Sequence, residues 1–142
     1  MGKFDNYGVI NVPEEVFSKM SACPIDVAFR IMGQKFMILI LRDLILFRSN
    51  RFGDLLKSIE GINKKTLSVR LRELEKNGII KRKIYIRNPV RAEYIVTKKG
   101  RMLSAILEQM AAFSLSFCYD EVFKDKKRRS FKDIIGRRPY SL

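Results

Sequence analysis

The side chains of this chain that could take part in chemistry are cationic and hydrogen-bonding groups rather than catalytic ones. No histidine occurs, and only two cysteines are present in 142 residues. The commonest general base, the commonest zinc ligand and any Ser–His or Cys–His nucleophile pair are therefore missing from the sequence. Neither a Gly-rich phosphate loop nor a pair of cysteines with metal spacing is present. The sequence accordingly predicts no enzyme, no cofactor and no metal site.

Cationic residues recur at helical spacing between residues 63 and 77. Since an α-helix advances by roughly 100° per residue, Leu67, Leu71 and Leu74 fall on one side of this helix. The opposite side carries Lys65, Ser68, Val69, Arg72 and Lys76. Lys and Arg can hydrogen-bond guanine, a hydroxyl can donate or accept, and an aliphatic group can contact the thymine methyl. This mixture suits the reading of base edges in the major groove of DNA.

The amino-terminal end of the same helix is suited to holding phosphate. Asn63 is expected to cap the helix, and Lys64 and Thr66 follow it in the first turn, where backbone N–H groups are free to bind an anion. Arg70 falls beside the leucines, so a structural role with an acidic partner is expected for it. The alternative for the whole outer face is an ordinary solvated helix surface.

A cationic hairpin is predicted immediately after this helix. Gly78 ends the helix, and residues 79–96 then alternate with a period of two around Asn88-Pro89, a turn signal. Arg87 and Arg91 flank this tip, where arginine can enter the minor groove or bind its phosphates. Ile80, Ile84 and Ile86 are expected to form the buried side of the first strand. The alternative is an edge strand whose charge only prevents aggregation.

The remaining elements follow from the same patterns. Helices are expected over residues 13–20, 24–33, 35–47, 51–59 with Asn50 as cap, and 97–117. Two short helices joined by a turn containing Gly61 form a helix-turn-helix. The predicted fold is mainly α with a small β-hairpin, a winged helix-turn-helix domain over residues 23–97. Residues 98–118 are assigned to dimerisation, because the last helix carries more apolar surface than a small domain can hide. Residues 1–22 are expected to form an amino-terminal arm with a short helix.

The overall charge points to a polyanionic partner. Lys and Arg number 29 against 15 Asp and Glu, which gives a net charge of +14 and a pI near 10.1. Part of the excess lies in a basic extension, residues 119–142. No apolar run reaches the length of a membrane span, and no signal peptide is recognisable. A cytoplasmic, nucleoid-associated protein is expected, with no membrane partner.

Several segments resemble one known family. They include Cys23-Pro24, the run from Gly33 to Arg42, the run from Arg51 to Leu55, the run from Leu67 to Glu75, Glu93-Tyr94 and the run from Thr97 to Arg101. These residues resemble the HxlR-type winged helix-turn-helix transcriptional regulators, which are related to the MarR group. The resemblance implies a homodimer on DNA that is joined through its amino- and carboxy-terminal helices, which assigns residues 1–22 to dimerisation as well. Phe36 stands where the family usually has Trp, and the basic extension lies outside the family pattern.

The two cysteines carry two alternatives. The resemblance implies that Cys23, in the Cys-Pro motif, corresponds to the oxidant-sensing cysteine of some family members, and that Cys118 could approach it across subunits. At the start of a helix, Cys23 would also lie where the helix dipole favours thiolate. The alternative is that both are inert small hydrophobic residues, as most intracellular cysteines are.

The sequence therefore predicts a transcriptional regulator that binds double-stranded DNA as a homodimer on a palindromic operator. The helix over residues 63–77 would enter the major groove, and the hairpin tip over residues 87–91 would contact the minor groove or the backbone. A winged-helix module for RNA or a protein partner is the alternative. A small-molecule effector is left open, because no sequence feature indicates one.

Overall fold

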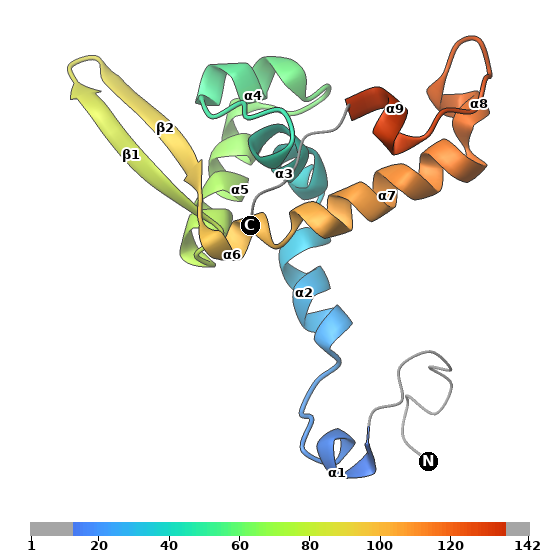
Figure 1. The fold of residues 1–142 in the computed structure, drawn as a ribbon. Helices are drawn as coiled ribbons and strands as arrows, with labels where there is room; N and C mark the ends of the chain where they lie inside the picture. Colours follow the sequence, from blue (N-terminus) through green and yellow to red (C-terminus); the bar gives the residue numbers. More distant parts are fainter. Residues whose placement is uncertain (1–12, 136–142) are drawn as a thin grey trace.

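The computed structural model describes residues 13–135, and the predicted arrangement of a mainly helical chain with one hairpin is confirmed. Residues 1–12 of the expected amino-terminal arm and residues 136–142 of the basic extension lie outside the described part. Figure 1 shows a compact body with three projections: the hairpin, the amino-terminal helices and the long helix α7.

The amino-terminal helices extend away from the body. Helix α1 (Glu14–Phe17) is shorter than the predicted 13–20, and Pro13 is its cap rather than its first residue. Helix α2 (Pro24–Met32) begins after Cys23 and ends at Gly33, as expected. Neither helix contains a buried residue, and Figure 1 shows α1 at the far end of α2 from the body.

Helix α3 (Met37–Ile45) forms the centre of the core, as its nearly continuous apolar sequence predicted. Its inward side chains pack with those of the two following helices and of the hairpin base; the buried apolar residues are Met37, Ile40, Leu41, Leu44, Leu55, Ile59, Leu67, Leu71, Leu74, Ile79, Ile80 and Leu107. Asp43 is the single buried charged residue among those described, and Arg42 pairs with its Oδ1 at 2.7 Å.

Helices α4 (Phe52–Ser58) and α5 (Lys64–Lys76) form the helix-turn-helix. Gly61 in the turn has a φ of 78°, which glycine adopts without steric cost. The expected cap of α4 was wrong: Arg51 occupies the cap position, and no side chain caps the helix. The backbone carbonyl of Asn50 instead accepts a hydrogen bond from Tyr94 in the hairpin.

Strands β1 (Ile80–Arg87) and β2 (Val90–Val96) form an antiparallel hairpin with Asn88-Pro89 at its tip. The expected half-buried first strand is correct only at its base. Ile80 is 1% exposed, whereas Ile84 and Ile86 are 50% and 48% exposed. The reason is geometric: the outer half of the hairpin projects beyond the body (Figure 1), and a bulge between Ile84 and Ile86 shifts the register.

The predicted helix over residues 97–117 is divided into α6 (Lys98–Arg101) and α7 (Ser104–Phe117). Thr97 caps α6 by accepting a hydrogen bond from the Gly100 N–H at 3.1 Å. Gly100 is buried so close to the hairpin base that an added Cβ would lie 2.3 Å from the Ile79 carbonyl oxygen. This contact holds α6 against the body. Met102 and Leu103 form the turn that separates α6 from α7.

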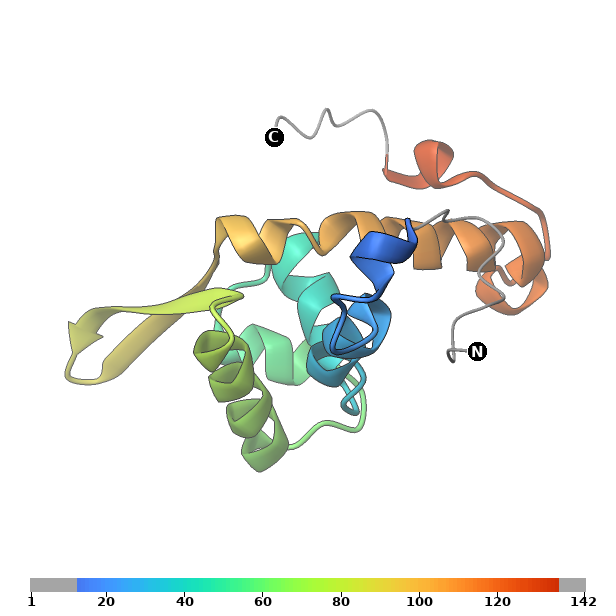
Figure 2. The same ribbon diagram turned by 90° about the horizontal axis from the view of Figure 1, so that it is seen from below.

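Two short helices complete the described chain, α8 (Tyr119–Val122) and α9 (Phe131–Ile135). Helix α9 folds back and packs on α7. Part of the basic extension, residues 119–142, therefore lies against the rest of the protein. Figure 2 shows α7 lying between α9 on one side and α5 on the other. Among the described residues, no helix is long and apolar enough to cross a membrane, and no cluster of three or more potential ligands could hold a metal ion.

Candidate nucleic-acid interface

Helix α5 separates its apolar and polar sides cleanly. Its inward face is Leu67, Leu71 and Leu74, each buried in the core. Its amino-terminal end is fixed by Asn63, whose Oδ1 accepts a hydrogen bond from the Thr66 N–H at 2.8 Å. This bond satisfies one of the backbone donors that a helix start leaves unpaired. The helix is therefore anchored along one side and at its first turn, with the other side free.

The outward face of α5 is open to solvent. Lys64, Lys65, Arg72 and Lys76 are exposed, and Val69 is 37% exposed, a fraction that leaves its methyl groups available for contact. Ser68 is half-buried, and its backbone carbonyl accepts a hydrogen bond from Arg72 Nε at 3.3 Å. This long bond leaves the terminal nitrogens of the Arg72 guanidinium group free to pair with a base edge or a phosphate.

Arg70 has the structural role that its position beside the leucines predicted. Its Nη1 lies 2.9 Å from Glu73 Oε2, and its Nε donates to the Lys35 carbonyl oxygen at 3.1 Å. The side chain therefore connects α5 to the segment before α3. Because its donors are engaged within the protein, we do not include Arg70 in the candidate interface.

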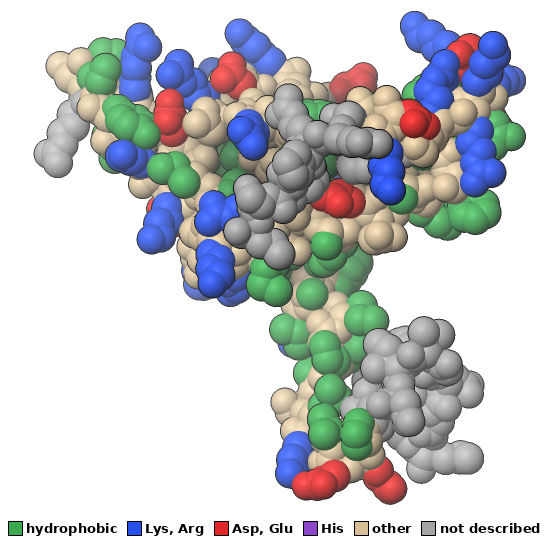
Figure 3. All heavy atoms as spheres, viewed as in Figure 1, with side chains coloured by type: hydrophobic (Ala, Val, Ile, Leu, Met, Phe, Trp, Pro, Cys, Tyr) green, Lys and Arg blue, Asp and Glu red, His purple; other side chains and the backbone are tan. Residues whose placement is uncertain are grey.

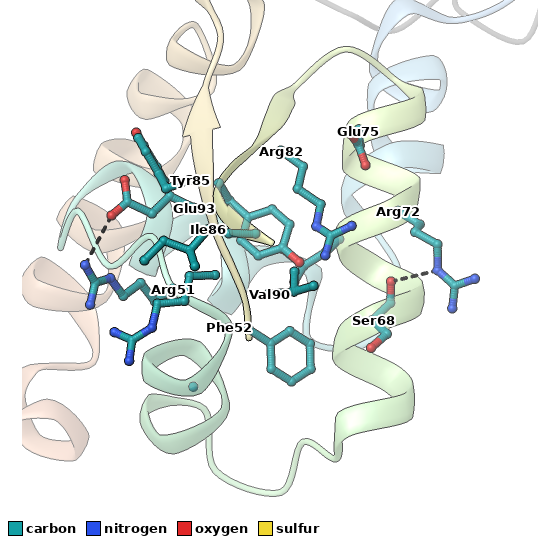
Figure 4. Close-up of a pocket in the computed structure, with 15 residues that line it drawn as sticks. Arg51, Phe52, Ser68, Arg72, Glu75, Arg82, Tyr85, Ile86, Val90 and Glu93 are labelled. Carbon is teal, nitrogen blue, oxygen red and sulfur yellow. Dashed lines mark hydrogen bonds and ion pairs between the residues drawn. The ribbon is translucent and has the colours of Figure 1, made fainter. Parts of the chain in front are cut away.

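A groove of about 1000 Å³ separates the outward side of α5 from the hairpin and the start of α4. Its lining includes four arginines: Arg51, Arg72, Arg82 and Arg91. In Figure 4, Arg82 extends from the hairpin toward α5, and the Phe52 ring lies between α4 and α5. Two acids, Glu75 and Glu93, line the same groove. The lining therefore carries an excess of positive charge, and it also includes the aromatic side chains of Phe52, Tyr85 and Tyr94.

Arg82 and Tyr94 meet inside this groove. They are register partners in the hairpin, and Tyr94 is half-buried. Burial raises the pKa of the Tyr94 hydroxyl above its ordinary value, and the positive charge of Arg82 partly opposes this rise. The hydroxyl therefore remains a hydrogen-bond donor throughout the neutral range, next to a guanidinium group.

Arg82, Arg51 and Tyr94 were not among the predicted site residues. Arg82 alternates with Ile80 and Ile84 on the side of the strand that was expected to be apolar. A cation at an inward position is costly unless it has a partner or a ligand, and this was the available signal. Arg51 had no comparable signal, because its position in the groove depends on its 3.3 Å ion pair with Glu93, which is 42 residues away along the chain.

The predicted site residues do not all lie in one place. Ser68, Arg72 and Arg91 line the groove together, whereas Lys64, Lys65, Thr66, Val69 and Lys76 lie elsewhere on α5. The side chain of Arg87 is outside the described part, although its backbone pairs with Val90 at the hairpin tip. Cys23 precedes α2 and Cys118 follows α7; both are half-buried and free.

Comparison with known proteins decides the family. The model of the HxlR-like helix-turn-helix family matches residues 31–122, which include the helix-turn-helix, the hairpin and α7. The chain belongs to the HxlR-like family. It is therefore a helix-turn-helix transcriptional regulator by family, a class that does not consist of enzymes, and the predicted winged-helix fold is confirmed.

Similar proteins support this assignment. An HTH-type transcriptional regulator of Synechocystis is 42% identical over 89 residues, which span 62% of this chain and 64% of that protein. YodB of Bacillus subtilis is 33% identical over 108 residues, 74% of this chain and 96% of YodB. The solved structure of the redox regulator HypR in its reduced form superposes with a TM-score of 0.63 at 28% identity, covering 71% of this chain and all of HypR.

Proposed function

We propose that this protein binds double-stranded DNA as a homodimer, with α5 in the major groove and the hairpin on the flanking backbone or minor groove. The observation that carries the proposal is the open outward face of α5, cationic and hydrogen-bonding, next to an arginine-lined groove. The groove would receive a phosphate strand, and the outward face of α5 would meet base edges. In this arrangement residues 23–97 bind DNA, while residues 1–22 and 98–118 join the subunits.

The exposed apolar surface supports the homodimer. Val16, Ile25 and Phe29 on the amino-terminal helices are largely exposed, and so are Phe113 and Phe117 on α7. Figure 3 shows apolar side chains along the projecting amino-terminal helices and beneath the end of α7. A groove on α7, with Ile106, Met110 and Phe113 in its walls, could take an apolar helix of a second copy. Twofold symmetry would then place two α5 helices on successive turns of a palindromic operator, about 34 Å apart.

Selection of bound duplexes from a random pool tests this function. We expect the purified full chain to enrich a palindromic sequence whose half-sites lie about one helical turn, or 34 Å, apart. Affinity for that sequence should fall steeply with salt, because phosphate contacts release counterions. Recovery of no common sequence, or equal affinity for single-stranded RNA, would contradict the proposal and favour an RNA-binding module.

We also propose that Cys23 and Cys118 form a redox-responsive pair between subunits. Solved structures similar to this chain include HypR in reduced and oxidised forms and YodB after treatment with diamide. Both cysteines are free here: Cys23 borders the amino-terminal segment assigned to dimerisation and precedes α2, and Cys118 follows α7, which is assigned to dimerisation. Oxidation would join the two sulfurs and transfer two electrons and two protons to an oxidant such as a peroxide, which is reduced to water.

Mass spectrometry under non-reducing conditions tests the cysteine pair. After mild peroxide treatment, we expect the mass of a covalent dimer and a peptide that links Cys23 to Cys118. Cys118→Ser should prevent this species while leaving DNA binding of the reduced protein intact. A wild-type protein that keeps its monomer mass and free thiols would show that the cysteines are only structural.

A further inference from the structure

A second cationic surface lies beyond the family match. Residues 124–133 contain six Lys or Arg and two Asp, and the HxlR-like match ends at residue 122. The loop between α8 and α9 carries most of these residues. Membership of the family therefore does not explain why this segment is cationic.

The two acids of this segment are already hydrogen-bonded within it. Asp125 accepts hydrogen bonds from Arg129 Nη1 at 2.8 Å and from the Lys127 N–H at 3.1 Å. These bonds lower the pKa of the Asp125 carboxyl to about 2. Asp133 accepts from the Ser130 N–H at 2.9 Å. The acids thus hold the loop in shape rather than neutralising its outward charges.

Four cations of the loop remain free to meet a partner. They are Lys124, Lys126, Lys127 and Arg128, which are exposed and form no ion pair with another residue of the described chain. Figure 3 shows a group of cationic side chains over the α8–α9 end of the molecule, separate from those near the hairpin. Holding like charges together on an ordered loop favours a polyanion, which relieves their mutual repulsion.

The chemistry of the loop fits a phosphate backbone better than a protein surface. Its one large aromatic residue, Phe123, is half-buried, and the Arg129 guanidinium lies 4.5 Å from its ring centroid. The loop therefore offers no exposed aromatic anchor of the kind that dominates protein–protein binding energy. Binding to phosphates needs only the cations, since counterion release supplies the affinity.

The position of the loop separates it from DNA bound by α5. Figure 2 shows α9 and α5 on opposite sides of α7, and Figure 1 shows the hairpin and the α8–α9 loop at opposite ends of the molecule. We propose that the loop over residues 123–130 binds the phosphate backbone of a second duplex, so that one protein assembly joins two DNA segments. This inference goes beyond operator recognition, because it needs no base contact.

A two-duplex capture experiment tests the inference. The full chain is loaded on an immobilised duplex of arbitrary sequence, washed, and offered a fluorescent duplex in solution. The test variant carries Lys124→Gln, Lys127→Gln and Arg128→Gln. The control variant carries Lys19→Gln, Lys98→Gln and Arg101→Gln, which removes the same charge from exposed sites outside residues 23–97 and outside the loop. We expect the test variant to bind the first duplex within about twofold of wild type and to capture the second at least tenfold less. The control should resemble wild type in both steps.

The salt dependence gives an independent measure. Loss of three phosphate contacts should reduce the slope of log affinity against log salt for the second duplex by about 2 to 3. Normal capture by the test variant would overturn the inference, because the two α5 helices of a dimer would then be joining the duplexes. If the test variant bound the first duplex more weakly than wild type, the inference would also be overturned, because the loop would then contact the same DNA as α5. In a further outcome, the wild type binds polyglutamate and not the second duplex, and polyglutamate binding is lost in the test variant. That result would overturn the inference and indicate an acidic protein partner.

Discussion

The backbone N–H of Tyr94 donates a hydrogen bond to the carbonyl oxygen of Asn50 at 2.8 Å. This bond joins the second strand of the hairpin to the residue before the helix-turn-helix. The ion pair between Arg51 and Glu93 adds a second connection one residue along each segment. The second strand of the hairpin is thus connected to the start of α4, and both line the groove beside α5.

Arg82→Ala tests whether this groove receives phosphate. We expect binding to weaken for every duplex alike, with a decrease of about 1 in the salt slope, because one phosphate contact is lost. Lys83→Ala is the matched control, since its side chain projects from the other face of the same strand. Salt titrations with fluorescent duplexes measure both variants. Equal losses would show that the groove has no special role.

Arg72→Ala and Lys64→Ala separate base recognition from phosphate binding. Loss of Arg72 should reduce discrimination between the preferred duplex and mismatched ones by about 1–3 kcal/mol. Loss of Lys64, at the helix start, should weaken all duplexes by the same factor. Competition binding against single-mismatch duplexes distinguishes the two. Identical profiles would mean that the outward face of α5 is wrongly assigned.

Gly100→Ala should lower the free energy of unfolding by about 1–3 kcal/mol, because the added Cβ would lie 2.3 Å from a backbone oxygen that cannot easily move. Gly53→Ala is the control: it lies in α4 with no atom within 4 Å of the new Cβ, and we expect a gain of up to about 1 kcal/mol from helix propensity. Urea denaturation followed by circular dichroism measures both. An unchanged free energy of unfolding for Gly100→Ala would contradict the close packing of α6 against the hairpin base.

Phe113→Asp should convert the proposed dimer to a monomer, because it places a charge in the apolar groove on α7. Ile84→Asp is a suitable control, since Ile84 is also an exposed apolar residue but lies on the hairpin. Analytical ultracentrifugation gives the mass of each variant. Dissociation by both substitutions, or by neither, would exclude α7 as the contact surface.

The raised pKa of Tyr94 predicts a loss of stability at alkaline pH. Because the folded state holds the phenol proton more tightly than the unfolded state, its contribution is fully present below pH 10, the ordinary tyrosine value. The contribution is lost as the pH rises through the higher folded-state value. Urea denaturation between neutral and strongly alkaline pH should therefore show a smaller pH dependence for Tyr94→Phe. An unchanged dependence would mean that other groups dominate.

The features that were predictable from sequence are those set by local periodicity. The leucine spacing of α5, the cap at Asn63 and the turn at Asn88-Pro89 depend on neighbours in the chain, and the structure contains each of them. Features set by distant contacts were not predictable in the same way. The close approach of Gly100 to Ile79 and the ion pair of Arg51 with Glu93 both join residues that are far apart in the chain. Strand periodicity also could not show that the outer hairpin leaves the body, so Ile84 and Ile86 were wrongly expected to be buried.

Helix α2 has a consequence for how this protein reaches its working form. It has nine residues and no buried side chain, and isolated helices shorter than about 12–15 residues are marginal in water. At high dilution, a single chain would therefore keep little order in the outer turns of α2, whereas Ile31 and Met32 at its end pack against the core. In the proposed homodimer, ordering of these turns and contact with the second subunit would be one event, so the protein concentration would determine how much of α2 is folded.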